Sequence, residues 1–335
     1  MATVVDLLTY PVKGCAGAPV DGSYLTPAGL AHDRSFMVVS VDGVYRTQRR
    51  DPRLALVRPT ISADGGRLTL ASAEPGGGDG RDVAHPRHAP RGRAGVRGGT
   101  DELHVDVTLS APRRDVDLFG VTYQGIDQGE EAAAWLSDFL GTPSRLVRVP
   151  PEHDRKTDGL TPGTSGYADS SAVHLLSRAS LAHLHARMAE RGAPPLAMDR
   201  FRPNIVIDSR PEERHGEDRW AAPHAEDRIR RMTIGEAELG YAKLAVRCAV
   251  TLVDQEAGAR GGPEPLRTLA DYRRAPGGGV VFGAKFSVVR TGKLSVGDEV
   301  AVEEWGDAEA RRPYLRAWRV LEELAGHPCG RGRQG

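Results

Sequence analysis

The chain has 335 residues and a formal net charge of zero, with 45 basic and 45 acidic side chains. This length can bury one or two sizeable hydrophobic cores, so we expect two packed domains. The balanced charge argues against a global field that gathers nucleic acid or an anionic membrane, so any basic patch has to be local.

The three cysteines are widely spaced, at Cys15, Cys248 and Cys329, and form no CxxC pair. Their odd number does not fit a disulfide framework, and their spacing argues against a zinc site or a built-in iron–sulfur cluster. The first ten residues do not resemble a signal peptide, and we find no run of about eighteen apolar residues. We therefore expect a cytoplasmic protein without a membrane segment.

In the first part of the chain, short β-branched segments are separated by Gly and Pro. They predict strands over residues 3–8, 35–40, 53–61, 68–70, 105–109 and 116–121. This pattern is typical of a small β-barrel or β-sandwich. Residues 74–100 are rich in Gly, Pro, Arg and His and have almost no apolar residues, which predicts a flexible surface insertion.

Apolar residues at helical spacing predict a helix over 130–140, close to the domain junction, and a second over 177–191 with Ser177 as a possible cap. Further strands are predicted at 205–208, 232–234, 238–241, 250–253, 280–289 and 300–304, and an amphipathic helix after Asp307. The fold class is therefore α+β and β-rich. We expect a β-barrel-like N-terminal domain over 1–125, a second domain over 126–306 and a helical tail over 307–335.

Cys248 follows Arg247 in a strand-like apolar run. A lone cysteine in such a run is often a small buried hydrophobic residue. Alternatively, the guanidinium of Arg247 favours the thiolate, which is the form that binds soft or high-valent metals. The two residues alone do not decide between these interpretations.

Four other segments carry groups that suit a phosphate. Each also has an ordinary explanation, as a strand start, a tight turn or an exposed ion pair. Arginine forks, an ammonium group, hydroxyl groups and a Gly-rich turn are donors that phosphate accepts. The residues concerned are Lys13, Gly14, Arg34, Ser170, Ser171, Arg202 and Asn204.

Taken in order, the blocks YPVKG, HDRSFMVV, DSS, RFRPNIVI, RCAVTLVDQEAG, VFGAKFSV and LSVGDEV resemble the MOSC family. Within that family, the chain is most similar to the two-domain branch that contains the mitochondrial amidoxime-reducing component and its bacterial relatives. The resemblance covers roughly residues 3–304, apart from 74–100. It implies a MOSC N-terminal β-barrel domain packed on a MOSC β-barrel domain with a few peripheral helices.

The resemblance also implies a molybdenum–molybdopterin cofactor, with Cys248 as the protein ligand of the metal. By the same resemblance, Asp254 is an acidic residue near the metal that relays protons, which makes Cys248 and Asp254 the catalytic candidates. The expected contacts of the cofactor, mainly at its phosphate end, are Lys13, Gly14, Arg34, Ser170, Ser171, Arg202, Asn204 and Arg247.

The chain departs from its relatives at three positions within or near the quoted blocks. Gly14 stands where relatives often have Ser, so a hydroxyl contact becomes a backbone N–H. Gln255 replaces the proline of the usual VDP turn. Lys285 stands where relatives have a Tyr near the pterin, and it adds a possible phosphate or pterin contact.

These features lead to the hypothesis of a molybdenum-dependent oxidoreductase that reduces N-oxygenated, in particular N-hydroxylated, compounds. No cysteine cluster follows residue 305, so we expect electrons from a separate ferredoxin, flavoprotein or cytochrome. No nucleic-acid or membrane partner is expected.

Two alternatives remain open. One is a non-catalytic carrier of the molybdenum cofactor or of sulfur, because MOSC domains also occur at the ends of cofactor sulfurases. The other is a β-rich binding protein without a metal. At the level of the whole family, the resemblance also implies pyridoxal phosphate binding.

Overall fold

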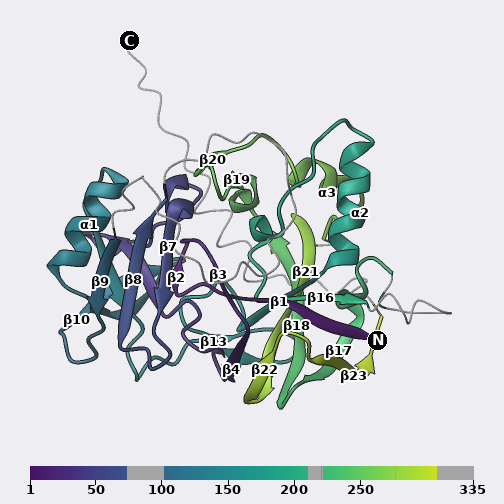
Figure 1. The fold of residues 1–335 in the computed structure, drawn as a ribbon, viewed down its shortest axis with the longest axis horizontal. Coiled ribbons are helices and arrows are strands. Elements are labelled where there is room, and N and C mark those ends of the chain that lie inside the picture. The colour runs from purple at the N-terminus through teal and green to yellow at the C-terminus, as the bar shows by residue number, and fades with distance from the viewer. Residues whose placement is uncertain (74–101, 210–219, 221, 276, 308–335) are drawn as a thin grey trace, which may run out of the picture.

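The computed structural model describes residues 1–73, 102–209, 220, 222–275 and 277–307. The predicted insertion at 74–100 and the predicted helix after Asp307 lie outside these residues. The described chain is β-rich, as predicted, and contains three α-helices (Figure 1). None of its helices is long and apolar enough to cross a membrane.

Seven strands close into a barrel, which forms the right-hand lobe in Figure 1. The barrel closes through β1 (Ala2–Thr9), which pairs with β23 (Glu299–Trp305) on one side and β16 (Ile205–Ser209) on the other. The remaining strands are β15 (Val173–Ser177), β21 (Val280–Arg290), β18 (Ala237–Arg247) and β17 (Ile229–Ile234), with β3 (Ala18–Val20) added beside β1. The first strand of the chain thus completes a barrel built mainly by the C-terminal half.

Alternation along the barrel strands fills two cores. All five residues of β15 are buried. Leu175 faces the core inside the barrel, whereas Leu176 packs in a second core beneath the helices α2 (Arg178–Ala189) and α3 (Leu266–Tyr272). Successive side chains of a strand point to opposite faces, so a strand that is covered on both sides is buried throughout.

The left-hand lobe contains two more sheets. One has the order β10 (Arg113–Leu118), β11 (Val121–Asp127), β12 (Ser144–Arg148), β6 (Phe36–Ser40) and β2 (Val12–Lys13). The other consists of β7 (Val57–Ile61), β8 (Arg67–Ser72) and β9 (Glu102–Asp106). Helix α1 (Glu130–Leu140) covers them and buries Ala132 and Leu136 with Phe36 and Leu68.

The described chain also contains three small sheets and several 3-10 helices. The sheets are β22 (Gly292–Ser295) with β4 (Gly22–Thr26) and β5 (Gly29–Leu30), β13 (Lys156–Thr157) with β14 (Gly163–Thr164), and β19 (Val253–Asp254) with β20 (Ala259–Arg260). The 3-10 helices are η1 (Pro52–Leu56), η2 (Met198–Phe201), η4 (Ala225–Arg228) and η5 (Ala249–Leu252).

The two helices predicted in the described chain are confirmed. Helix α1 has the predicted limits, with Glu130 and Glu131 at its positive end and Gly141 in the left-handed conformation at its C-terminus. Helix α2 is slightly shorter than predicted. Ser177 caps it as expected, because its hydroxyl accepts the backbone N–H of Ser180 at 3.1 Å.

Four predicted strands need correction. The strand expected over 105–109 is β9, which ends at Asp106. Residues 53–56 form η1, because Pro52 starts a tight turn where a strand was expected. The predicted strand over 116–121 is two strands joined by a turn, in which Phe119 and Gly120 have φ of 59° and 77°. Residues 250–252 lie in η5, so the chain leaves its strand at Cys248. Short apolar runs do not distinguish these local conformations.

The predicted domain limits at 125/126 and 306/307 stay predictions. The connectivity shows that a cut at 125/126 does not separate the sheets. Strand β1 pairs within the barrel, whereas β12 pairs with β6 in the other lobe.

Candidate functional site

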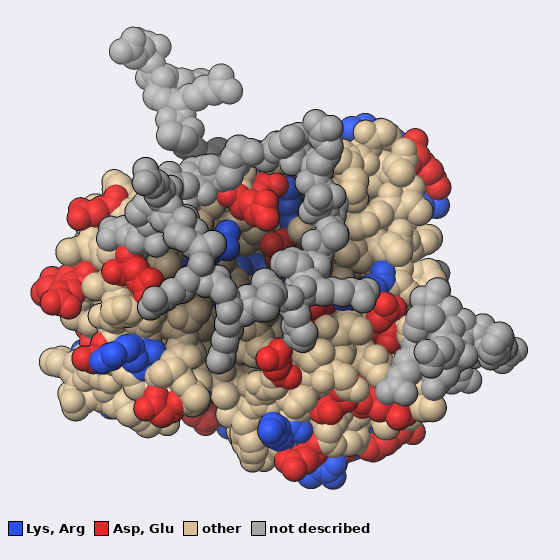
Figure 2. All heavy atoms as spheres, viewed as in Figure 1, with Lys and Arg blue, Asp and Glu red and all other residues tan. Residues whose placement is uncertain are grey.

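Basic side chains from distant segments meet between the two lobes. Lys13 ends β2, Arg34 precedes β6, Arg202 follows η2, Arg247 ends β18 and Lys285 lies on β21. We call these five residues the cationic cluster. Arg34 is close enough to lower the pKa values of Lys13, Arg202 and Lys285. Figure 2 shows Lys or Arg atoms in a hollow between the lobes.

Tyr10 organises the two arginines nearest the centre of the cluster. The guanidinium carbons of Arg34 and Arg202 lie over its ring, at 4.1 and 4.2 Å from the ring centre. The hydroxyl of Tyr10 donates to the carbonyl oxygen of Pro203 at 3.1 Å, and its backbone N–H donates to Asp33 at 2.8 Å. The tyrosine, 1% exposed, therefore holds both arginine-bearing turns.

Both arginines occupy a left-handed backbone conformation, with φ of 46° at Arg34 and 55° at Arg202. Such conformations are costly for residues other than glycine and persist only where surrounding contacts impose them. Nη1 of Arg34 donates to Asp33 at 2.6 Å, and Nη1 of Arg202 donates to the carbonyl oxygen of Cys15 at 2.7 Å. These contacts fix the direction of both side chains.

Asn204 lies in the same place, as predicted, but its amide already has protein partners. Oδ1 accepts hydrogen bonds from Arg34 at 3.1 Å and from the backbone N–H of His174 at 3.2 Å. Nδ2 donates to the carbonyl oxygen of Leu8 at 3.2 Å. This arrangement suits a residue that positions Arg34 rather than one whose amide is free for a ligand.

Lys13 is 6% exposed and forms an ion pair with Asp169, the residue before the predicted serine pair. Burial lowers the pKa of Lys13, whereas Asp169 opposes that shift. The ammonium group also lies 4.9 Å from the centre of the Phe119 ring. The carboxylate of Asp169 is 63% exposed, so the partner of this buried cation stands at the edge of the site.

The loop that carries Ser170 and Ser171 is held by a residue that the sequence did not indicate. Arg155 donates to the carbonyl oxygens of Gly166 at 3.1 Å and of Asp169 at 2.8 Å. Ser170 then accepts a 2.6 Å hydrogen bond from Nζ of Lys285. Burial lowers the pKa of Lys285 to about 7, so this lysine is only partly charged near neutral pH.

Arg247 and Cys248 stand where β18 ends. Nη2 of Arg247 donates to the carbonyl oxygen of Phe201 at 2.7 Å, and burial lowers the pKa of the guanidinium. Cys248 is partly exposed and is a free thiol. Its carbonyl oxygen accepts from the N–H and hydroxyl of Thr251, at 3.1 and 3.0 Å, as the chain turns into η5.

Asp254 lies on the short strand β19 just beyond η5. Its Oδ2 accepts from Arg200 at 2.7 Å, and its Oδ1 accepts from the N–H groups of Glu256 and Ala257 at 3.0 and 2.9 Å. Burial opposes ionisation, but the two N–H groups and Arg200 together lower the pKa of Asp254. Asp199, in η2, has the opposite character, because burial raises its pKa and its Oδ1 has no partner.

Gly14 and Gln255, two departures noted in the sequence, face each other through Gln48. Gln48 donates to the carbonyl oxygen of Gly14 at 2.7 Å and exchanges 3.0 Å hydrogen bonds with Gln255. Gly14 has φ of 83°, so a side chain at this turn would be strained. These contacts join the turn after Lys13 to the segment after Cys248.

The residues present fit an anionic group that also carries hydrogen-bonding atoms. In the cationic cluster, carboxylates pair with Lys13 and Arg34, whereas Arg202 and Arg247 donate to carbonyl oxygens and Lys285 to a hydroxyl. Neutral acceptors do not balance buried positive charge, and an anion between these groups would. Buried atoms without partners, Nε of Arg247 and Nε2 of His174, remain available as well.

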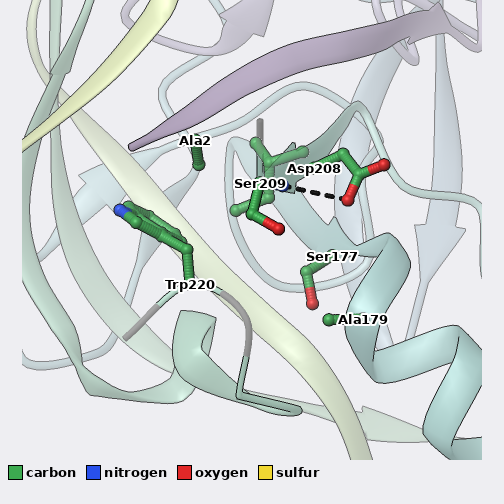
Figure 3. A pocket seen from close by; sticks show the side chains of 7 residues that line it. Ala2, Ser177, Ala179, Asp208, Ser209 and Trp220 are labelled. Atoms are coloured by element: carbon green, nitrogen blue, oxygen red, sulfur yellow. Dashed lines mark hydrogen bonds between the residues drawn. The ribbon is translucent and has the colours of Figure 1, made fainter. Parts of the chain in front are cut away.

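A separate surface hollow lies beside the barrel (Figure 3). It is lined by Ala2, Ser177, Ala179, Ile207, Asp208, Ser209 and Trp220. None of the predicted site residues belongs to it, and its only carboxylate, Asp208, accepts the backbone N–H of Ser209 at 2.9 Å. The chemistry indicated by the sequence is therefore at the junction of the lobes.

Sequence reasoning missed several residues of this site. Tyr10 and Asp169 are the first residues of the blocks YPVKG and DSS, so their position was indicated but their contacts were not. Arg155 and His174 gave no signal, because one stands alone in a polar loop and the other interrupts an apolar strand.

Comparisons with known proteins match both lobes of the chain. The model of the MOSC N-terminal beta barrel domain matches residues 1–143, and that of the MOSC domain matches residues 162–301. Human mitochondrial amidoxime-reducing component 1 is 31% identical over 318 residues, which cover 90% of this chain and 82% of that protein.

Two further relatives show the range of the family. Mitochondrial amidoxime reducing component 2 of Rattus norvegicus is 32% identical over 320 residues, covering 90% of this chain and 83% of that protein. The molybdenum cofactor sulfurase of Danio rerio is 29% identical over 299 residues, covering 84% of this chain but 31% of that protein.

Proposed function

The chain belongs to the two-domain MOSC family of the mitochondrial amidoxime-reducing components, and from this premise we propose that it is a molybdenum-cofactor-dependent oxidoreductase. The observation that supports the proposal most directly is the gathering of Lys13, Arg34, Arg202 and Arg247, the last of which directly precedes Cys248 in the chain. These residues come from both lobes, and a bound anion would balance their buried positive charge.

In this proposal the cationic cluster holds the phosphate end of molybdopterin. Lys13, Arg34 and Arg202 supply the charge, and Lys285 acts together with the hydroxyl groups of Ser170 and Ser171. The turn at Gly14 offers a backbone N–H group, and Asn204 fixes the position of the Arg34 side chain. Arg247 contacts the cofactor nearer the metal, and the thiolate of Cys248 is the metal ligand that the protein provides.

The proposed reaction reduces an N-hydroxylated compound. One N–OH group, two electrons and two protons give one N–H group and one water molecule. The bound molybdenum cofactor supplies the two-electron chemistry at the N–O bond. The electrons come one at a time from a separate redox protein of the ferredoxin, flavoprotein or cytochrome class. The substrate class is taken from the names of the relatives.

The chain's own residues would manage protons and orientation. Arg247 stabilises the neighbouring thiolate by its positive charge. Asp254 stays ionised at neutral pH because its pKa is lowered, so it accepts and passes on protons rather than storing one. Asp199, whose pKa is raised, is better suited to hold a proton.

The test is expression in a host that makes molybdopterin, followed by measurement of molybdenum, pterin and turnover. With chemically reduced viologen as donor, the wild type should reduce an N-hydroxyamidine or an N-hydroxylated purine. Cys248→Ala should lose turnover and most molybdenum while it retains pterin, because the phosphate grip lies elsewhere. A wild-type protein that carries molybdenum but turns over no member of an N-hydroxylated panel would contradict the reductase function.

A second candidate, a non-catalytic carrier of the cofactor or of sulfur, is favoured by the similarity to molybdenum cofactor sulfurase. In that case Cys248 would carry a persulfide or present the cofactor to an acceptor. Persulfide that leaves the purified protein when an acceptor is added would support the carrier. Molybdenum that stays bound and changes redox state on reduction would support the enzyme.

Three earlier expectations are not part of this proposal. Pyridoxal phosphate binding stays a family-level prediction. A cytoplasmic location also stays a prediction, since the two amidoxime-reducing relatives compared above are named mitochondrial. The β-rich binding protein without a metal would be indicated if wild-type protein from the same host contained neither molybdenum nor pterin.

A further inference from the structure

His174 differs chemically from the other side chains of the site. It lies on β15 and is 6% exposed. Its backbone is tied to Asn204, which donates its N–H to the carbonyl oxygen of His174 at 2.8 Å and accepts the N–H of His174 at 3.2 Å. The backbone of His174 is therefore fixed beside the residue that holds Arg34.

The two ring nitrogens of His174 have different surroundings. Nδ1 lies 3.4 Å from the carbonyl oxygen of Arg202. A carbonyl oxygen can only accept, so Nδ1 carries the proton and Nε2 carries a lone pair. Nε2 is buried and has no partner. It is therefore an acceptor without a donor, an uncommon state for a buried polar atom.

Burial and the neighbouring positive charges keep the ring neutral. Burial, Arg247 and Lys285 all lower the pKa of His174 well below 6.5, and Arg34 acts in the same direction. The lone pair on Nε2 is thus present throughout the neutral range.

The glycine opposite the ring shows how closely β21 approaches it. Gly283 has φ of 80°, and a Cβ atom built there would lie 2.6 Å from Nε2 of His174. A side chain at position 283 would collide with this nitrogen, so only glycine allows β21 to approach it so closely. Lys285 lies two residues further along β21 and pairs in register with His174. The strand thus presents a glycine and a cation to the same imidazole.

A phosphate group is a poor partner for Nε2 of His174, because both would act as hydrogen-bond acceptors. Phosphate oxygens accept hydrogen bonds, and the cationic cluster supplies donors for them. Nε2 needs a ligand atom that carries a hydrogen, so it matches the part of the cofactor that has N–H groups. The fused pterin ring system has such groups, whereas the phosphate end at neutral pH presents mainly acceptors.

We propose that Nε2 of His174 accepts a hydrogen bond from an N–H group of the pterin ring and so fixes the ring end of the cofactor. This inference rests on the proposed function. It divides the site into a phosphate grip, made by the cationic cluster, and a ring-recognition group, made by His174.

The proposal and a purely structural role for His174 predict different effects of removing the imidazole. Under the proposal, Nε2 is a buried acceptor without a partner, which destabilises the cofactor-free fold, so a leucine of similar size should be tolerated there. The carbonyl oxygen of Arg202 would still accept from Nη2 of Arg34 at 3.3 Å. If the imidazole were instead a packing element, its removal would lower stability and disturb the neighbouring arginines.

The experiment compares His174→Leu with His174→Gln, whose side-chain oxygen restores an acceptor. Each full-length protein is produced in a molybdopterin-competent host, and retained pterin is measured by fluorescence after oxidative release. Loss of one such hydrogen bond should lower retention of the Leu variant about tenfold, and the Gln variant should recover much of it. The melting temperature of cofactor-free His174→Leu should not fall.

Binding of inorganic phosphate to the cofactor-free proteins separates the two ends of the site. Its affinity should be the same in wild type and His174→Leu, because the phosphate grip is intact. Equal pterin retention in wild type and His174→Leu would overturn the inference, as would a parallel loss of phosphate affinity. A wild-type protein without any pterin would overturn the proposed function itself, and this inference with it.

Discussion

Arg202 stacks on Tyr10, with its guanidinium carbon 4.2 Å from the centre of the tyrosine ring. Arg34 lies over the same ring at 4.1 Å. Cation–π contacts of this kind contribute from about 0.5 to 2 kcal/mol each, more where the groups are desolvated. A single aromatic side chain thus sets the separation of two arginines that reach the site from different lobes.

We predict that Tyr10→Leu weakens the phosphate grip more than Tyr10→Phe does. The Leu variant loses both ring contacts, so its unfolding free energy should fall by about 2–4 kcal/mol and its phosphate affinity by about tenfold. The Phe variant keeps the ring and loses only the hydrogen bond to Pro203, worth about 1 kcal/mol. Denaturant unfolding and phosphate titration measure both effects. Equal phosphate affinities in the two variants would show that the ring does not position the arginines.

Lys285 should make anion binding depend on pH. Its pKa is lowered to about 7, chiefly by burial. As the pH rises through that value the lysine loses its charge, and the affinity of the cofactor-free protein for phosphate should decline. The affinity of Lys285→Met should lack this component of the decline when phosphate is titrated between about pH 6 and 9. An identical pH dependence in both proteins would assign the change to another group.

The same shift has a consequence for stability. The ordinary pKa of the lysine is 10.5, so between about 7 and 10.5 the unfolded chain binds more protons at this position than the folded chain. Raising the pH through this interval therefore favours the folded state. Below about pH 7 the buried lysine is charged, and the cost of burying that charge lowers the unfolding free energy by its full amount. The difference in unfolding free energy between Lys285→Met and wild type should shrink as the pH rises.

Parts of the fold with a long, regular pattern were predictable from the sequence. Helix α1 has apolar residues at helical spacing over eleven residues and a glycine at its end, and its limits were predicted correctly. Residues 53–56 and 250–252 were expected to be strands, because a short apolar run fits a strand, a 3-10 turn or a buried loop equally well. Packing against the rest of the chain decides between them.

The candidate site was predictable as a set of residues but not as a set of contacts. Lys13, Arg34 and Arg202 stand in recognisable sequence blocks, and the structure brings them together. The use of Asn204 to hold Arg34, and the lone acceptor on His174, depend on segments far apart in the chain. Such pairings follow from how β15, η2 and the turn before β6 pack, which local patterns do not encode.

Asp169 should act as a competitor of phosphate for Lys13. Its carboxylate pairs with the lysine, and Lys13 and Lys285 hold the pKa of Asp169 well below its usual range despite partial burial. In Asp169→Asn, Lys13 loses its counter-charge, so the affinity for inorganic phosphate should rise severalfold and the phosphate-free protein should melt lower. Added phosphate should restore the melting temperature more in this variant than in wild type, because an anion can then neutralise the lysine.

A matched variant at another ion-paired carboxylate, Glu152, supplies the control for this prediction. The exposed pair of Arg113 and Glu152 lies far from the cluster in sequence and has a 2.8 Å contact. Glu152→Gln should leave phosphate affinity unchanged, since the described residues show no contact between this exposed pair and the cationic cluster. If Asp169→Asn bound phosphate no more tightly than Glu152→Gln, the carboxylate would not be competing for Lys13.

Asp254→Asn tests the expected proton relay. The carboxylate stays ionised between about pH 5 and 9, because its pKa is lowered from 3.8 by the N–H groups of Ala257 and Glu256 and by Arg200. A relay needs a group that accepts a proton transiently, so the amide should lower kcat on the order of a hundredfold at unchanged molybdenum and pterin content. The acid limb of the wild-type pH profile must then come from another group. Asp199 is the candidate, since burial raises its pKa, and Asp199→Asn should shift that limb.

The ion pair with Arg200 offers the competing explanation for any effect of Asp254→Asn. Arg200 is 7% exposed in its side chain and lies 2.7 Å from Asp254, so removal of the carboxylate leaves a largely buried cation without its partner. That loss should appear as a lower unfolding free energy, by about 1 kcal/mol given the partial exposure of Asp254. Arg200→Gln breaks the same pair and keeps the carboxylate. If Arg200→Gln and Asp254→Asn lowered kcat equally, the pair would matter for positioning alone. A large loss confined to Asp254→Asn, with a changed solvent isotope effect on kcat, would identify the carboxylate as part of the proton path.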